Sequence, residues 1–189
     1  ATWTNAATLN VGRMYHTATL LPHGQVLVTG GDSGVIDFYN GPALADVETY
    51  NQLSTLFYAL DDTNLVWTTG GDANWFLQTT NTHDNVSAAQ SGVIGDNQQS
   101  WIQTTVTGPG MLSFWWRVSG AANTATLEFD IDDVGQDQIS GEPAWSQLTV
   151  AIPPGDHTLK WVYYKLSAAT AGYDAGFLDE VSFVPDPPS

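Results

Sequence analysis

Residues 110–133 read GMLSFWWRVSGAANTATLEFDIDD, and their alternation of apolar and polar side chains decides the fold class. Because successive side chains of a strand point to opposite faces, residues 111–118 and 125–132 each predict one apolar and one polar face. The polar faces carry an indole, a guanidinium and three carboxylates: Trp115, Arg117, Glu128, Asp130 and Asp132. We therefore expect two antiparallel strands joined by a loop, with one face of their sheet in the core.

The composition favours an all-β protein. The chain has 189 residues, of which 42% are hydrophobic, so it can bury a substantial core. Its 18 glycines, 9 prolines and many aromatic residues favour short strands with frequent turns. We see no pattern that strongly predicts a helix.

The charge of the chain excludes several kinds of partner. Twenty acidic residues against four basic ones give a net charge of -16, which repels nucleic acid and anionic membrane surfaces. The chain has no cysteine, so disulfides and thiol chemistry are excluded. No apolar run is long enough to predict a membrane span.

The first part of the chain contains one repeat-like pattern. Two alternating segments, Thr17–Leu21 and Gln25–Thr29, flank a predicted turn at residues 22–24, and a strand-like DVETYN begins at Asp46. With Trp3 and the run GRMYHTATLLPHGQVLVTGG at residues 12–31, this pattern resembles part of a kelch repeat. We expect Arg13 and His16 to pack within this partial kelch-like blade, residues 1–55.

A single blade cannot bury both of its faces, and kelch propellers need several. Three outcomes stay open for the blade: it leans on the second domain, it pairs with another copy through its open edge, or it is a remnant of a longer parent chain.

Residues 56–185 predict a second domain, a two-sheet β-sandwich, and residues 186–189 are interpreted as the start of a linker. Turns are indicated at residues 70–71, 108–110, 141–143 and 153–155. The predicted strands are Leu65–Trp67, Trp75–Thr79, Ser87–Gly92, Gln99–Val106, Met111–Ser119, Ala125–Asp132, Gln147–Ile152, Asp156–Tyr164 and Gly176–Val184.

Several motifs of this domain carry a resemblance: GDANW (71–75), QSWIQTTVTGPGMLSFWW (99–116), PPGDHTLKWVYYK (153–165) and GYDAGFLDEVSF (172–183). They resemble a jelly-roll module of large secreted bacterial proteins, related in architecture to MAM-type domains and jelly-roll carbohydrate-binding modules. The resemblance implies a non-catalytic module, secreted or at the cell surface, that binds a polysaccharide or cell-surface glycan or mediates adhesion. It also implies a structural calcium ion.

The expected calcium ligand is Asp179, which matches the position that the resemblance gives to an aspartate near the end of the final strand. Asp174, Asp72 and Asp96 are the expected co-ligands, because calcium takes six to eight oxygen ligands. The alternative is that these aspartates cap turns by accepting backbone N–H groups. Residues 130–137 do not fit the EF-hand pattern and predict a hairpin turn.

Glycan binding requires an exposed aromatic ring and polar side chains that bond hydroxyl groups. If the strand of Lys160 lies beside the two opening strands, one polar face would gather the candidate ligand-binding residues Trp115, Arg117, Glu128, Asp130, Lys160 and Tyr164. The alternative is an ordinary solvated face with cross-strand ion pairs.

The remaining aromatic residues fall into two groups. Trp75, Trp116 and Trp161 alternate with aliphatic residues and are expected in the core. Trp101, Trp145 and Tyr173 lie near predicted loops or strand ends, and we expect them to line a site at the edge of the sandwich.

Two other functions stay open. One is a structural or protein-interaction spacer of a larger extracellular protein or enzyme. The other is an enzyme with paired carboxylates, which would need two acids facing each other in a cleft. We find no hydrolase or phosphate-binding motif, and the interpretation is therefore a binding module, not an enzyme.

Overall fold

The computed structural model describes residues 13–20, 26–32, 47–50, 55–167 and 169–187. The chain divides into two compact units, residues 1–54 and 55–189. Nearly all the regular structure is β-strand, as predicted; α1 (Thr55–Ala59) is a single short helix turn at the start of the second unit. In the described part of the chain, no helix has the length and apolar character that a membrane span needs.

The first unit contains a three-stranded antiparallel meander of β1 (Thr17–Leu20), β2 (Val26–Thr29) and β3 (Val47–Tyr50). Arg13 is buried and donates a hydrogen bond from Nη1 to the carbonyl oxygen of Gly30, at 3.1 Å, whereas His16 is exposed. Trp3, the turn at residues 22–24 and Asp46 lie outside the described residues. The kelch likeness and pairing through the open edge stay predictions.

The second unit is built on one eight-stranded antiparallel sheet whose order is β5-β6-β11-β7-β10-β8-β9, with β4 paired to β7. Its strands are β4 (Thr68–Gly71), β5 (Phe76–Gln78), β6 (Ala88–Gln90), β7 (Gln98–Ser119), β8 (Ala125–Ile131), β9 (Val134–Ser140), β10 (Ser146–Lys165) and β11 (Ala175–Pro185). Most of the predicted strands are therefore present.

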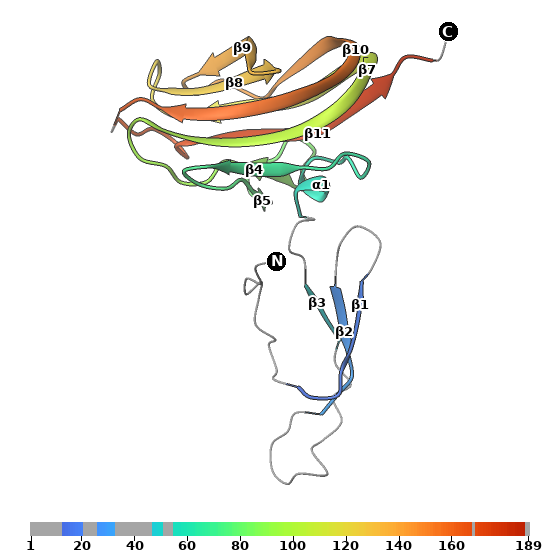
Figure 1. The fold of residues 1–189 in the computed structure, drawn as a ribbon. Coiled ribbons are helices and arrows are strands. Elements are labelled where there is room, and N and C mark those ends of the chain that lie inside the picture. The colour runs from blue at the N-terminus through green and yellow to red at the C-terminus, as the bar shows by residue number, and fades with distance from the viewer. Residues whose placement is uncertain (1–12, 21–25, 33–46, 51–54, 168, 188–189) are drawn as a thin grey trace. The chain divides into compact units, whose positions relative to one another are not determined.

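Two long strands, β7 and β10, pass through both halves of this sheet (Figure 1). Residues 100–103 of β7 pair with β4, and residues 110–119 pair with β11. In β10, residues 159–165 pair with β8 and residues 146–152 pair with the second half of β7. We call β4, β8, β9 and the adjoining halves of β7 and β10 the first layer, and β5, β6, β11 with the other halves the second layer.

The two layers pack face to face around an aromatic core. The ring of Phe114, in the second layer, lies 5.0 Å from that of Phe129 and 5.1 Å from that of Trp161, both in the first layer. All three side chains are fully buried, and Trp75 and Trp116 are also in the core, as predicted. The second unit is thus a β-sandwich with its own hydrophobic core.

The predicted hairpin at residues 110–133 is wrong, although its alternation is correct. Residues 110–119 and β8 lie in different layers, and β8 pairs with β9 and β10 instead. The segments 108–110 and 153–155 are not turns between strands either. They lie inside β7 and β10, and the register between these strands shifts between Ile152 and Gly155. Glycine and proline here interrupt regular pairing without ending the strand.

Two smaller predictions also need correction. Leu65–Trp67 is not a strand, because pairing with β7 begins at Thr68. The strand β9 was not predicted, since VGQDQIS is largely exposed and has no apolar alternation. The hairpin turn expected within residues 130–137 does occur, at residues 132–133 between β8 and β9.

Candidate functional site

The structure divides the six candidate ligand-binding residues between the two outer faces of the sandwich. Glu128 and Asp130 of β8 and Lys160 and Tyr164 of β10 share the outer face of the first layer. Trp115 and Arg117 lie on the outer face of the second layer, because β7 changes layer between its two halves. The prediction that all six residues share one polar face is therefore wrong. Four of them lie on the outer face of the first layer, and two lie on that of the second layer.

Trp115 and Arg117 are occupied by contacts within the chain. The imidazole ring of His83 stacks on Trp115, with ring centroids 3.6 Å apart and planes inclined by 14°. Arg117 donates from Nη1 to Asn81 Oδ1 at 2.7 Å, and its Nη2 lies 3.6 Å from Glu142 Oε2. The loop that carries Asn81 and His83 thus covers one face of the indole and binds the guanidinium.

Trp145 and Tyr173 also belong to the second layer. Each packs the edge or face of its ring against buried Phe177, at centroid distances of 6.3 Å and 5.7 Å. These two residues cover the strand β11 and do not meet Trp101, so the three aromatic residues expected at the sandwich edge do not form one site.

Trp101 lies instead on the outer face of the first layer, where it forms a flat aromatic surface. Its cross-strand neighbours are Gly70 on β4 and Val162 on β10. A Cβ atom added to Gly70 would lie 2.9 Å from both Cε2 and Cη2 of the indole. The ring therefore rests directly over the glycine backbone, and the side chain stays partly exposed.

Polar side chains surround this ring on the same face. Cross-strand partners share a face, so Gln103, Lys160 and Asp130 form one row across β7, β10 and β8. Lys160 Nζ lies 5.6 Å from the centroid of the Trp101 ring and 3.0 Å from Asp133 Oδ1. The face thus combines an aromatic ring, an ammonium group, carboxylates and amides.

Burial is deep at the centre of this face. Val162 is 1% exposed and Asp130 is 7% exposed, although both side chains point outward between inward-facing neighbours. Burial, and then the charge of Glu128, raises the pKa of Asp130, while Lys160 opposes that rise. Burial and the nearby carboxylates, Glu128 first among them, likewise raise the pKa of Tyr164.

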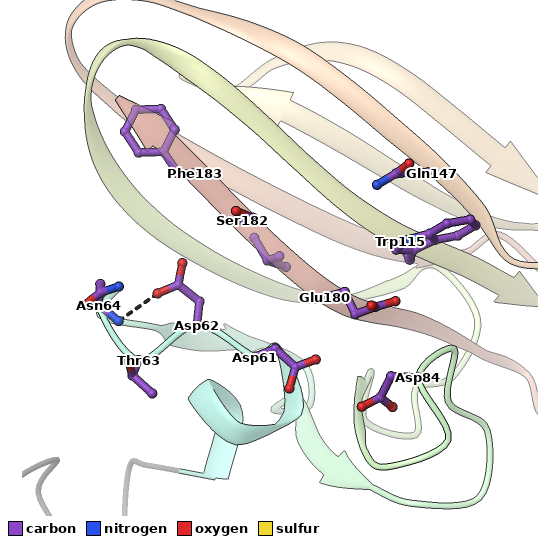
Figure 2. Close-up of a pocket in the computed structure, with 11 residues that line it drawn as sticks. Asp61, Asp62, Thr63, Asn64, Asp84, Trp115, Gln147, Glu180, Ser182 and Phe183 are labelled. Carbon is purple, nitrogen blue, oxygen red and sulfur yellow. Dashed lines mark hydrogen bonds between the residues drawn. The ribbon is translucent and has the colours of Figure 1, made fainter. Parts of the chain in front are cut away.

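A second polar site gathers three carboxylates from distant parts of the chain. Asp61 follows α1, Asp84 lies in the loop between β5 and β6, and Asp179 is on β11. One oxygen of each lies within 4.8 Å of the others. Asp61 and Asp84 also line a cavity of about 520 Å³ together with Trp115, Gln147 and Glu180 (Figure 2).

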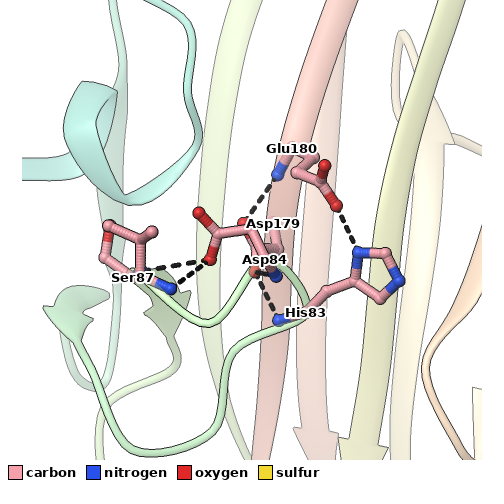
Figure 3. Close-up of polar contacts among 6 residues, drawn as sticks. His83, Asp84, Ser87, Asp179 and Glu180 are labelled. Atoms are coloured by element: carbon pink, nitrogen blue, oxygen red, sulfur yellow. Dashed lines mark hydrogen bonds and ion pairs between the residues drawn. The ribbon is translucent and has the colours of Figure 1, made fainter.

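Asp179 is fully buried, and it holds the loop of residues 83–87 against β11. Its Oδ2 accepts the N–H of His83 at 2.7 Å, and its Oδ1 accepts that of Glu180 at 2.8 Å (Figure 3). The His83 ring is also hydrogen-bonded to Glu180. Burial, with a contribution from the charge of Asp84, raises the pKa of Asp179 to about 6 despite these amide donors.

The expected co-ligands of Asp179 lie elsewhere. Asp174 pairs with the buried ammonium of Lys165 and accepts the hydroxyl of Tyr163 at 3.3 Å. Asp72 Oδ2 accepts the N–H of Gln99 at 2.9 Å, and Asp96 is exposed in the loop before β7. The alternative of a carboxylate that accepts a backbone N–H therefore describes Asp72, whereas Asp174 is paired with side chains. The structure does not gather these three around Asp179.

Sequence reasoning missed Asp61, Asp84 and the position of Trp101. The two aspartates come together only through the pairing of distant segments, which no local pattern shows. A signal for Trp101 was present, because Gln99, Trp101 and Gln103 alternate with inward-facing Ser100 and Ile102. That alternation places the indole on the polar face of a strand and not at its edge.

No protein-family model matches the chain, and no curated protein matches it. Solved structures do match. One is TmCBM61 in complex with β-1,4-galactotriose, with a TM-score of 0.44 and 13% identity over 70% of this chain and 95% of that one. Another is the K3 adhesin domain of Lys-gingipain from Porphyromonas gingivalis, with a TM-score of 0.47 and 16% identity over 66% and 95%.

A third match is the secreted serine protease VesC from Vibrio cholerae, with a TM-score of 0.48 and 13% identity over 93% of this chain but only 44% of the protease. Carbohydrate-binding modules are thus among the structural neighbours. At these identities and TM-scores, the argument about function rests on the residues of the chain itself. The likeness to kelch repeats and MAM-type domains stays a prediction.

Proposed function

We propose that the second unit is a non-catalytic carbohydrate-binding or adhesion module of a secreted bacterial protein, and that it binds glycans on the outer face of the first layer. The observation that carries this proposal is the indole of Trp101 lying over Gly70. A ring held parallel to the sheet offers its outer face to the apolar face of a sugar, and its rigid support lowers the entropy lost on binding.

The side chains around Trp101 complement such a ligand. Glu128 and Asp130 are hydrogen-bond acceptors, Lys160 is a donor, and Gln103 can do both. Sugar hydroxyl groups both donate and accept, so this mixture suits them. Individual contacts of this kind are weak, and several modules in a parent protein would strengthen them by multivalency.

We also propose that a calcium ion stabilises this unit at Asp61, Asp84 and Asp179. Carboxylate oxygens are the ligands that calcium prefers, and three like charges this close repel one another unless a cation or protons compensate them. Burial first, and the charge of Asp84 second, raise the pKa values of Asp61 and Asp179. The site would tie α1, the loop before β6 and β11 together.

The calcium proposal is tested by calorimetric melting of the protein with added calcium and with a chelator. We expect a higher melting temperature with calcium, and we expect Asp84→Asn to abolish the difference, because the variant removes one ligand charge. Asp72→Asn is the matched control, which should keep the full response. Identical transitions of the wild-type protein in calcium and in chelator would remove the ion from the account.

The glycan proposal is tested by affinity electrophoresis through gels that contain soluble polysaccharides. We expect at least one polysaccharide to retard the wild-type protein. Trp101→Ala should weaken that retention by about tenfold or more, since the loss of a central aromatic contact costs roughly 2 kcal/mol. If no polysaccharide retards the protein, the alternative of a structural or protein-interaction spacer replaces this proposal.

A further inference from the structure

The most unusual polar group on the outer face of the first layer is Asp130. Its side chain is 7% exposed, and its Oδ1 has no hydrogen-bond partner among the described residues. It points outward, because its neighbours Phe129 and Ile131 face the core. A buried acceptor without a donor costs stability, so unpaired groups of this kind are rare unless another molecule satisfies them.

The charges around Asp130 restrict what that molecule can be. Glu128 lies two residues away on the same face, and Asp133 lies at the turn after β8. Lys160 is the cation of the row, and it is already paired with Asp133. An anionic group placed here would meet the carboxylates of Glu128 and Asp130 at low dielectric, while the ammonium of Lys160 is already paired with Asp133. A hydroxyl group avoids this repulsion.

A cavity at the other end of the same face is a separate observation that also bears on the charge of the ligand. It has a volume of about 410 Å³ and lies where β4 meets β7. Its polar lining consists of hydroxyl and amide side chains: Asn64, Thr68, Gln103, Thr104 and Thr105. None of the residues that line it is charged, in a chain with a net charge of -16. Thr68 and Gln103 are cross-strand partners, so this cavity continues the row that contains Lys160 and Asp130.

We infer that this face selects uncharged polysaccharides, and that Asp130 is the specificity-determining residue that accepts a hydrogen bond from a sugar hydroxyl. The inference rests on the proposed glycan-binding function and names the class of its ligand. The uncharged cavity beside β4 contacts a further part of the same ligand through its hydroxyl and amide groups. Glycans that carry carboxylate or sulfate groups are excluded by charge.

The experiment compares neutral with anionic polymers. Hydroxyethyl cellulose and carboxymethyl cellulose are the matched pair, because they share one backbone and differ in charge. The neutral β-1,4-galactan and the anionic polygalacturonate are tested separately, all at physiological ionic strength. We expect retardation by at least one neutral polymer, and none by the anionic polymers. Retention that is as strong on an anionic polymer overturns this inference and leaves the proposed function standing. No retention on any polymer overturns both.

Two variants test the role of Asp130 on the best neutral polymer. Asp130→Asn keeps the shape of the side chain and removes its charge, so we expect affinity to fall by about fivefold or more, since hydrogen bonds to charged acceptors are roughly twice as strong. Asp137→Asn is the matched control, because it removes the same charge on β9 at a position opposite core-facing Phe129. Its affinity should stay within about twofold of the wild type. Equal affinities of Asp130→Asn and wild type, with unchanged melting temperatures, overturn the assignment.

Discussion

At the scale of single residues, the absence of a side chain at Gly70 has the clearest consequence for the proposed binding face. The glycine lets the indole of Trp101 lie flat on the sheet, where any Cβ atom would come too close to the ring. We therefore expect Gly70→Ala to tilt the ring and to reduce polysaccharide affinity by several-fold, with little loss of thermal stability.

Gly95→Ala is the control for that substitution, because its Cβ would meet only the end of the flexible Gln98 side chain, at 3.2 Å. Isothermal titration of both variants with the best polysaccharide would measure the effect. Equal affinities for Gly70→Ala and Gly95→Ala would mean that the flat ring is not the binding surface.

A second residue-scale prediction concerns pH. His157 Nδ1 lies 2.7 Å from Asp132 Oδ2, and this hydrogen bond is the main cause that raises the pKa of His157 above 6.5 and lowers that of Asp132 below 3.8. The histidine therefore stabilises the fold below pH 6.5, and this contribution is lost as pH rises through its raised pKa. The aspartate contributes above pH 3.8 and loses its contribution as pH falls through its lowered pKa.

The pair is thus fully effective between about pH 4 and pH 6.5. A titration followed by NMR should place the pKa of His157 above 6.5, and Asp132→Asn should bring it back toward that value. His157→Gln should flatten the decline of melting temperature on the alkaline side of the window. A His157 that titrates at or below 6.5 in the wild type would contradict this account.

Single residues also show what the sequence could predict of the site. Asp179 was expected as a calcium ligand only because it matches the position that the resemblance gives to an aspartate, and that role stays a prediction. The alternation around Lys160 placed that residue and Tyr164 on a polar face. Asp61 and Asp84 could not be predicted as its neighbours. Their approach depends on where α1 and the loop before β6 come to lie, which is a tertiary property.

At the scale of elements, β7 and β10 decide which residues meet. The alternation of each half was readable from the sequence, and so were the interruptions at residues 108–110 and 153–155. What the sequence could not show is that each interruption bends a continuous strand, because Gly-Pro segments are equally typical of turns. Because each strand continues past its interruption into the other layer, Trp115 and Arg117 lie on the opposite outer face from Lys160.

The end of β10 is held by a buried ion pair, and this gives an element-scale prediction. Lys165 is 6% exposed and pairs with Asp174, which lies just before β11. Lys165→Met would leave the carboxylate of Asp174 unpaired beside the buried Tyr163, so we expect a loss of roughly 3 kcal/mol in the free energy of unfolding. Urea denaturation would measure this value.

Two further variants make that measurement decisive. Asp133→Asn breaks the exposed pair with Lys160, and we expect it to cost less than about 1 kcal/mol. Replacing Lys165 and Asp174 together with apolar residues should recover much of the loss, because no charge is then left unpaired. A single Lys165→Met variant as stable as Asp133→Asn would show that the pair does not hold the end of β10.

At the scale of the whole molecule, the fold class follows from composition and alternation, whereas the proposed function rests on how residues are divided between the two layers. The core of the second unit unites both layers through Phe114, Phe129 and Trp161. Its two outer faces differ in chemistry. One carries Trp101 among polar side chains, and the other carries Trp115 beneath the ring of His83.

The central claim is that the first of these faces binds the glycan, and the two tryptophans test it most directly. Isothermal titration of Trp101→Ala and Trp115→Ala with the same polysaccharide compares one substitution on opposite sides of the sandwich. We predict that Trp101→Ala loses affinity by about tenfold or more, and that Trp115→Ala, once shown to be folded, binds within about twofold of the wild type. Loss of binding in Trp115→Ala with full affinity in Trp101→Ala would contradict the account.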